Sequence, residues 1–135
     1  MKKDTGIRAI RLIAAWDLLL TLPFAIPLVN ARLIEALSLA HGLISPRRPF
    51  PAFDGLHLFF VTLFGIMAVL WAIVRMQRPS RYLALSDTIG RAVVAIVMIS
   101  FTALGGSAVP ALFSLSEICL GIVQAVVLAR MGRED

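Results

Sequence analysis

The sequence predicts an all-α fold, a four-helix transmembrane bundle with a short amphipathic surface helix in its first, outer loop. Of its 135 residues, 59% are hydrophobic and 16% are charged, and the mean hydropathy is +0.90. One small water-soluble core cannot bury so much apolar surface. Four segments also reach the roughly 20 helical residues that a hydrocarbon core of about 30 Å requires, and basic residues gather at their ends.

We expect a single four-span membrane domain over residues 1–135. The spans lie at about residues 9–29, 56–75, 85–106 and 109–129. The first span carries an acid, Asp17, within a run of leucines, and it is longer than the hydrophobic part of a signal peptide. No small-residue cleavage site follows it. We therefore expect this span to stay in the mature chain.

The first loop contains a segment with the pattern of an amphipathic helix. In residues 31–43, Leu33, Ile34 and Leu37 lie at helical spacing between polar residues. This pattern predicts a short helix on the membrane surface, with these three side chains toward the bilayer. Three prolines then exclude a regular helix: Pro46, Pro49 and Pro51. Asp54 follows them and is well placed to cap the second span.

The distribution of basic residues predicts the orientation of the spans. Three of the 13 lysines and arginines lie at the ends of the spans that face the first loop: Arg32, Arg47 and Arg48. The other ten share the opposite side: Lys2, Lys3, Arg8, Arg11, Arg75, Arg78, Arg81, Arg91, Arg130 and Arg133. Cytoplasmic loops carry the excess of basic residues, so both termini are expected in the cytoplasm. These residues flank spans and form no soluble basic domain, so no nucleic-acid partner is expected.

Four polar residues within the spans are expected to form an interior cluster: Asp17, Arg91, Glu117 and Gln124. At about 1.5 Å of rise per residue, their depths in the membrane are similar. We expect Asp17 to be satisfied chiefly by Arg91, because charges in a bilayer turn inward and pair. Two interpretations stay open. Either the cluster only fixes the register of the helices, or Glu117 exchanges a proton or meets a cationic or hydroxylated ligand.

A second pair lies at the outer entrance of span two, where Asp54 and His57 are one helical turn apart. It is interpreted either as a helix cap with an interfacial histidine or as an imidazole oriented toward a quinone or a lipid head group. Phe60 and Phe64 share the face of His57 and either line a site for a lipidic ligand or face acyl chains.

Common enzyme signatures do not occur in the sequence. It contains no CxxC, HExxH, P-loop, GxSxG or dinucleotide fingerprint. Cys119 is the single cysteine, and its apolar surroundings favour a buried thiol over a nucleophile. No cofactor or metal site is predicted, and the chain is more consistent with a non-enzyme.

The segment HLFFVTLFGIMAVLWAIVRMQRP (residues 57–79), preceded by FDG and followed by SDTIGR (residues 86–91), resembles a set of small bacterial four-span membrane proteins without an assigned function. The likeness includes WDLLLTLPFAIP and so touches spans one to three. It implies a protein of the bacterial inner membrane with a four-helix fold, and it transfers no catalytic residues. In architecture alone the chain is similar to DoxX-like proteins and to small multidrug transporters. Its long outer loop and strong charge bias depart from the transporter pattern.

Three classes of function remain after these observations. The first is an accessory or binding subunit that packs a larger membrane complex or a homo-oligomer, or a bundle that binds a lipidic ligand. The second is a proton-coupled transporter of small hydrophobic cations, with Asp17 or Glu117 as the exchanging carboxyl. The third is a membrane enzyme on a lipid-like or quinone-like substrate. We rank the accessory or ligand-binding protein first.

Overall fold

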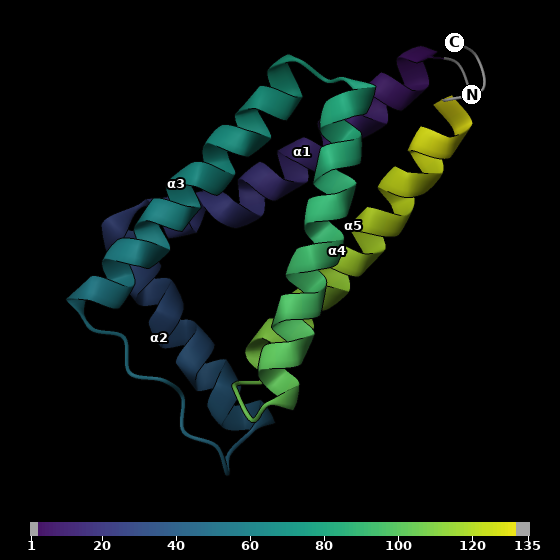
Figure 1. The fold of residues 1–135 in the computed structure, drawn as a ribbon. Helices are drawn as coiled ribbons and strands as arrows, with labels where there is room; N and C mark the ends of the chain where they lie inside the picture. The colour runs from purple at the N-terminus through teal and green to yellow at the C-terminus, as the bar shows by residue number, and fades with distance from the viewer. Residues whose placement is uncertain (1–2, 132–135) are drawn as a thin grey trace.

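The computed structural model describes residues 3–131, which contain five α-helices and no strand (Figure 1). The helices are α1 (Lys3–Ala25), α2 (Pro27–Ile44), α3 (Gly55–Gln77), α4 (Arg81–Ala103) and α5 (Val109–Met131). Each of α3, α4 and α5 is long and apolar enough to cross a membrane, whereas α1 and α2 meet the same criterion only together. This confirms, for the described residues, an all-α fold with helices that are apolar enough to span a membrane. The expected domain of residues 1–135, with Lys2 and Arg133, extends beyond the described residues.

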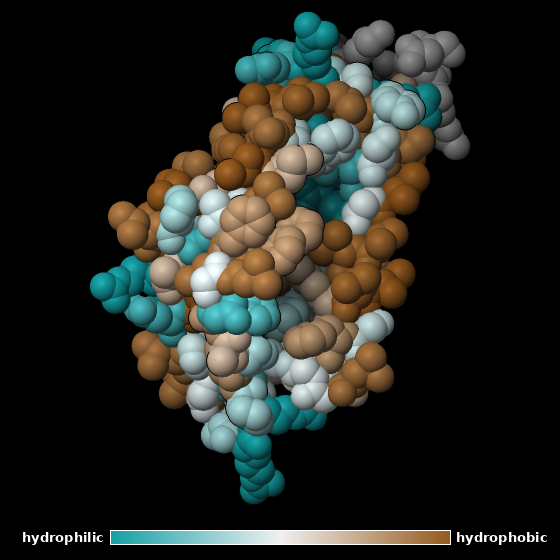
Figure 2. Space-filling view, turned by 60° about the vertical axis from the view of Figure 1, so that its left-hand side comes forward, coloured by the Kyte–Doolittle hydropathy of each residue, from teal (hydrophilic) through white to brown (hydrophobic). Residues whose placement is uncertain are grey.

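The helices form two packed pairs, α1 against α3 and α4 against α5. From the short turn that joins them, α3 and α4 diverge, and α2 crosses from the far end of α3 to the turn between α4 and α5 (Figure 1). Many large hydrophobic side chains of α3, α4 and α5 are exposed. Hydrophobic residues, in brown, cover much of the face that Figure 2 shows. Lipid is the solvent that suits such a surface.

The chain bends by 98° between α1 and α2. Ile26, at the bend, has an extended backbone (φ −107°, ψ 113°), because the ring of Pro27 disfavours a helical conformation for the residue before it. The span expected at residues 9–29 therefore ends at Ala25, and the helix expected at residues 31–43 begins at Pro27 and reaches Ile44. The predicted boundaries did not include this effect of Pro27.

The end of α1 lies directly against α3. A Cβ atom on Gly65 would lie 2.5 Å from the carbonyl carbon of Phe24 and 2.6 Å from the amide nitrogen of Ala25. Only glycine permits this approach between two backbones. Just beyond the bend, the fully buried Asn30 donates from Nδ2 to Oγ1 of Thr62 on α3 over 2.6 Å. These contacts fix the bend at one position along α3.

The far end of α2 is held by neutral hydrogen bonds. Nε2 of the buried His41 lies 2.7 Å from the carbonyl oxygen of Arg48, and Nδ1 lies 2.8 Å from Oγ of Ser107. A carbonyl only accepts, so Nε2 carries a proton, and in the neutral imidazole Nδ1 accepts from the serine hydroxyl. We call these three residues the α2 anchor. It joins α2 both to the loop after it and to the turn before α5.

The ends of the apolar helices follow local sequence signals. Residues 45–54 are irregular, and Oδ1 of Asp54 accepts from the backbone N–H of His57 over 3.0 Å, which confirms the predicted cap of α3. Oγ of Ser80 caps α4 by accepting from the N–H of Leu83. Gly105 turns the chain between α4 and α5 with φ of 95°, a conformation that favours glycine. The three helices begin and end within four residues of the predicted spans.

Candidate functional site

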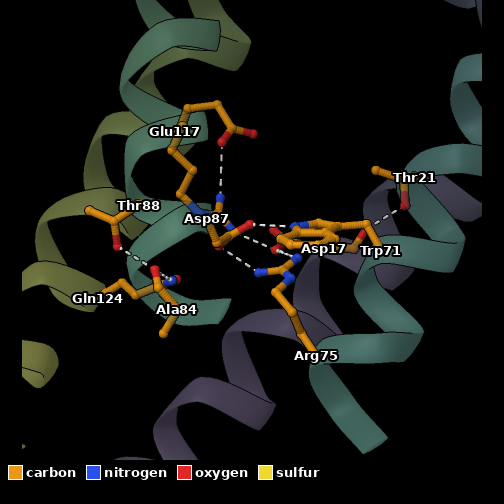
Figure 3. A network of polar contacts seen from close by, with 10 residues as sticks. Asp17, Thr21, Trp71, Arg75, Ala84, Asp87, Thr88, Glu117 and Gln124 are labelled. Carbon is orange, nitrogen blue, oxygen red and sulfur yellow. Dashed lines mark hydrogen bonds and ion pairs between the residues drawn. The ribbon is translucent and has the colours of Figure 1, made fainter. Parts of the chain in front are cut away.

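Four charged side chains from three helices close into a ring. Asp17 comes from α1, Arg75 from α3, and Asp87 and Arg91 from α4. Arg75 donates from Nη2 to Asp17 and from Nη1 to Asp87, both over 2.5 Å. Arg91 donates from Nη2 to Asp17 and from Nε to Asp87, the latter over 3.0 Å. We call these residues the charge ring (Figure 3).

The charge ring is formally neutral and almost completely buried. Two guanidinium groups face two carboxylates, and their side chains are between 3% and 12% exposed. Trp71 adds a hydrogen bond from its indole N–H to the second oxygen of Asp87, over 2.9 Å. The ring joins α3 to α4, which otherwise pack little against each other, whereas α1 also packs against α5 through a hydrophobic cluster that includes Ile10 and Val127.

Glu117 of α5 is a third carboxylate beside this neutral ring. Its Oε2 accepts from Nη1 of Arg91 over 2.9 Å, and its side chain is 26% exposed, more than any member of the charge ring. In Figure 3 its second oxygen, Oε1, points away from the ring, and it makes no hydrogen bond within the described part of the chain. With Glu117, the site contains three carboxylates and two guanidiniums. It therefore has one formal negative charge in excess.

Two adjoining cavities open beside these charges. The polar cavity has a volume of about 460 Å³, and its wall includes Asp17, Thr21, Trp71, Arg91 and Glu117. The aromatic cavity has a volume of about 380 Å³, and five phenylalanines contribute to its wall: Phe24, Phe50, Phe53, Phe101 and Phe113. Thr21 and Glu117 line both cavities. The two cavities together therefore have a charged end and an apolar end.

The polar cavity is not sealed from the side of the bundle. Residues of both α3 (Ala68 and Trp71) and α4 (Gly90 and Val94) line it, and these two helices diverge from a common turn. In Figure 2 a recessed hydrophilic area is visible between hydrophobic ridges of the surface. The polar cavity is therefore open between α3 and α4.

The predicted interior cluster is only partly brought together. Asp17, Arg91 and Glu117 meet as described, but Gln124 lies two helical turns along α5 from Glu117, where Nε2 donates to the carbonyl oxygen of Ala84 over 2.6 Å. The expectation that Arg91 chiefly satisfies Asp17 holds only in part, because Arg75 binds Asp17 as well. The predicted span boundaries placed Gln124 at the depth of Arg91, whereas in the structure it lies beside Ala84, seven residues from Arg91 on α4.

The outer residues that were considered for a site lie outside both cavities. Asp54 and His57 do form a pair, with 2.7 Å between Oδ1 and Nδ1, but both side chains are more than half exposed. The backbone N–H of His57 lowers the pKa of Asp54 below its usual 3.8. Phe60 and Phe64 are 46% and 71% exposed and do not line either cavity. The predicted ligand-lining role of these two phenylalanines is therefore not supported by their positions.

Two side chains of α2 were predicted to face the bilayer, but they face the interior of the helix bundle. Ile34 and Leu37 line the aromatic cavity, whereas Leu28, Leu39 and Leu43 of the same helix are at least 75% exposed. Apolar residues lie on both sides of α2, so its sequence pattern did not distinguish the inner from the outer face.

Sequence reasoning missed two members of the charge ring, Arg75 and Asp87. Arg75 was counted only as a topology signal at the end of a span, although it is 2% exposed. A signal for both residues exists in the helical spacing, since Asp87 precedes Arg91 by four residues and Trp71 precedes Arg75 by four. Within residues 3–131, no group of histidine, cysteine and acidic side chains has the arrangement of a metal site.

Neither a protein-family model, nor a curated protein, nor a solved structure matches this chain. The functional argument therefore rests on the geometry of the two cavities and of the charges between them.

Proposed function

We propose that this chain is a small ligand-binding protein of the bacterial inner membrane that holds one amphipathic, lipid-like molecule in its two adjoining cavities. The observation that carries the proposal is that a charged cavity adjoins an aromatic one, with Thr21 and Glu117 on the wall of both. A molecule with a polar head and an apolar tail matches both ends at once. As an accessory subunit, the chain would present or store this molecule for a larger membrane complex.

The size and lining of the cavities support this proposal. Both volumes fall within the range of about 300–1,000 Å³ that is typical of small-molecule sites, which are mostly apolar with a few placed polar groups. The lateral opening between α3 and α4 suits a ligand that arrives from the bilayer. A membrane enzyme with His57 as proton donor is less well supported, because His57 lies outside both cavities.

We propose a topology of four crossings, with both termini in the cytoplasm and the charge ring in the inner half of the membrane. The excess of basic residues at the α3–α4 turn and at the chain ends supports it. Along the helix axes, α1 ends about 12 Å outward of Asp17 and α4 ends about 24 Å outward of Asp87. Because α2 runs from the end of α1 to the outer end of α4, its two ends differ in depth by about 12 Å. The helix is about 27 Å long, so it lies closer to the membrane plane than to the normal, as an oblique form of the expected surface helix.

The proposal is tested with a brominated ligand and one tryptophan. The chain has two tryptophans, so Trp16→Phe leaves Trp71, on the wall of the polar cavity, as the reporter. In nanodiscs of zwitterionic lipid, a fatty alcohol with bromine on its chain should quench Trp71 fluorescence with saturation, because a binding site fills whereas bilayer partitioning does not.

A matched pair of variants on α5 separates the cavity from the lipid-facing surface. Ser116→Phe fills part of the aromatic cavity and should abolish the saturable quenching. Leu115→Phe adds the same ring at a 59% exposed position outside both cavities. This variant should keep the saturable quenching of Trp71. Equal, unsaturable quenching in all three proteins would show that the cavities hold no ligand.

A further inference from the structure

We infer that the ligand of this site carries a positively charged head group, an ammonium on an apolar chain, and that Glu117 is its counter-ion. The inference rests on the proposed function, since it assigns the chemistry of the molecule that the two cavities hold. It follows from three features of the site: the use of the arginine donors, the position of the excess charge, and the kind of groups that both cavities share.

The two arginines have no charge to spare for an anionic head group. Arg91 donates from Nε, Nη1 and Nη2 to three different carboxylates, and Arg75 donates from both of its terminal nitrogens to two. A phosphate or carboxylate on the ligand would compete with these pairs and would add a second excess negative charge. In a low-dielectric interior, an uncompensated buried charge is strongly unfavourable.

The excess negative charge lies where a ligand head would be. Glu117 is on the wall of both cavities, and its Oε1 makes no hydrogen bond with any described residue. An ammonium beside Oε1 would make the site formally neutral and would form a charge-assisted hydrogen bond. Asp17 is less suited to this role than Glu117, because its side chain is only 12% exposed and its Oδ2 already accepts from both arginines, which balance its charge.

The other residue shared by the cavities is also an acceptor. Thr21 donates its hydroxyl proton to the backbone oxygen of Asp17 over 2.8 Å, so its Oγ1 has only lone pairs to offer a ligand. An ammonium has N–H donors and no acceptor, which complements Oγ1 of Thr21 and Oε1 of Glu117 together. The apolar chain then extends among the phenylalanines of the aromatic cavity.

Three ligands with the same ten-carbon chain test the head group. Decylamine, decanol and decanoate are each titrated at pH 7.5 as competitors of the brominated alcohol, and the quenching of Trp71 in the Trp16→Phe protein is the measured signal. The protein is held in nanodiscs of phosphatidylcholine, and empty nanodiscs give the partitioning baseline. We expect decylamine to bind at least about tenfold more tightly than decanol, and decanoate to bind least. A preference for decanol or decanoate would overturn the inference and leave the proposed function standing. Absence of saturable binding by all three would overturn both.

A charge-neutral variant then tests the counter-ion. Glu117→Gln keeps the size of the side chain and an oxygen for Arg91, and it should weaken decylamine binding at least about tenfold while decanol binding stays within about twofold. Glu35→Gln, at an exposed residue paired with Arg32 on α2, removes the same charge away from the two cavities and should change neither affinity. Equal decylamine affinity in native, Glu117→Gln and Glu35→Gln proteins would exclude Glu117 as the counter-ion.

The source of the ammonium is distinguished by the lipid of the nanodisc. If the natural ligand is a membrane lipid with an amine and no phosphate, adding sphingosine to the nanodisc should weaken decylamine binding by competition. If it is a free short-chain amine, sphingosine should leave the decylamine affinity unchanged. Weaker decylamine binding when phosphatidylethanolamine replaces phosphatidylcholine would overturn the exclusion of head groups that carry a phosphate.

Discussion

The charge ring and the α2 anchor each join separate helices, but they do so with different chemistry. The charge ring links α1, α3 and α4 through four ionised side chains that are nearly all buried. The α2 anchor links α2 to the turn before α5 through neutral hydrogen bonds of His41. The aromatic cavity reaches Ser107 at the anchor and Glu117 beside the ring. Each connection therefore bounds the proposed ligand site at one end.

The difference indicates which end of the site is fixed and which can adapt. Each charge in the ring needs its partners, because a buried ion without one is far more costly than a neutral group without a hydrogen bond. The position of the head-group end is therefore strongly determined. The tail end is bounded by α2 and an irregular loop, whose weaker connections allow adjustment to different apolar chains.

The largest effect is expected at the charge ring. Asp17→Ala leaves two arginines with one ring carboxylate, and Arg91→Ala leaves three carboxylates with one arginine, so each should destabilise the protein by about 3–5 kcal/mol. The double variant keeps the Arg75–Asp87 pair, and its loss should be smaller than the sum of the two single losses. Thermal unfolding in detergent measures all three differences.

The same cycle tests whether the ring acts as one unit. Strictly additive losses would show that Asp17 and Arg91 are energetically independent, and Arg75 would then be the arginine that satisfies Asp17.

The next effect in size is expected where α1 meets α3. In Gly65→Ala the new methyl group collides with backbone atoms of Phe24 and Ala25, which cannot rotate away, so the loss should be at the upper end of the roughly 1–3 kcal/mol typical of overpacking. Gly121→Ala on α5 is the matched control, because its Cβ would lie an ordinary 3.7 Å from Cβ of Arg91. Equal melting temperatures for the two variants would contradict this close approach.

The fold was largely predictable from the sequence, because long apolar runs and their flanking caps are local signals. The three apolar helices and the Asp54 cap followed from such signals. The 98° bend was not predicted, since Pro27 and the contact at Gly65 act together and only the first is visible in the local sequence. Helical rise brought Asp17, Arg91 and Glu117 to a common level, but it placed Gln124 there as well, and the structure has Gln124 beside Ala84.

The candidate site was predictable only in part, for the same reason. Asp17, Arg91 and Glu117 were identified because charges inside spans are rare, whereas Arg75 lies near a helix end and resembled an interfacial charge. The phenylalanines of the aromatic cavity come from α1, α4, α5 and the loop before α3, and no periodicity relates them. Only the folded chain brings them together.

A smaller effect is expected at the α2 anchor. Ser107→Ala leaves Nδ1 of His41 and the backbone N–H of Val109 without their partner, which should cost roughly 1–2 kcal/mol. It should also increase amide hydrogen exchange in the last turn of α2, while exchange near the charge ring stays constant. Ser116→Ala, which removes only a bond within α5, is the control. Faster exchange around Asp87 in Ser107→Ala would show that ring and anchor are not separate.

The smallest effect is expected at the exposed cap of α3, where the N–H of His57 lowers the pKa of Asp54. A carboxylate whose pKa is lower in the folded state stabilises the fold above its unfolded pKa, and this stabilisation is lost as the pH falls through the folded value. Asp54→Asn keeps a capping oxygen without the charge. The native chain should therefore melt slightly higher than Asp54→Asn at pH 7, and the difference should start to shrink at about pH 4 and disappear once the pH is below the lowered pKa of Asp54. A difference that stays unchanged from pH 7 down to about pH 2 would show that the charge of Asp54 contributes nothing to this cap.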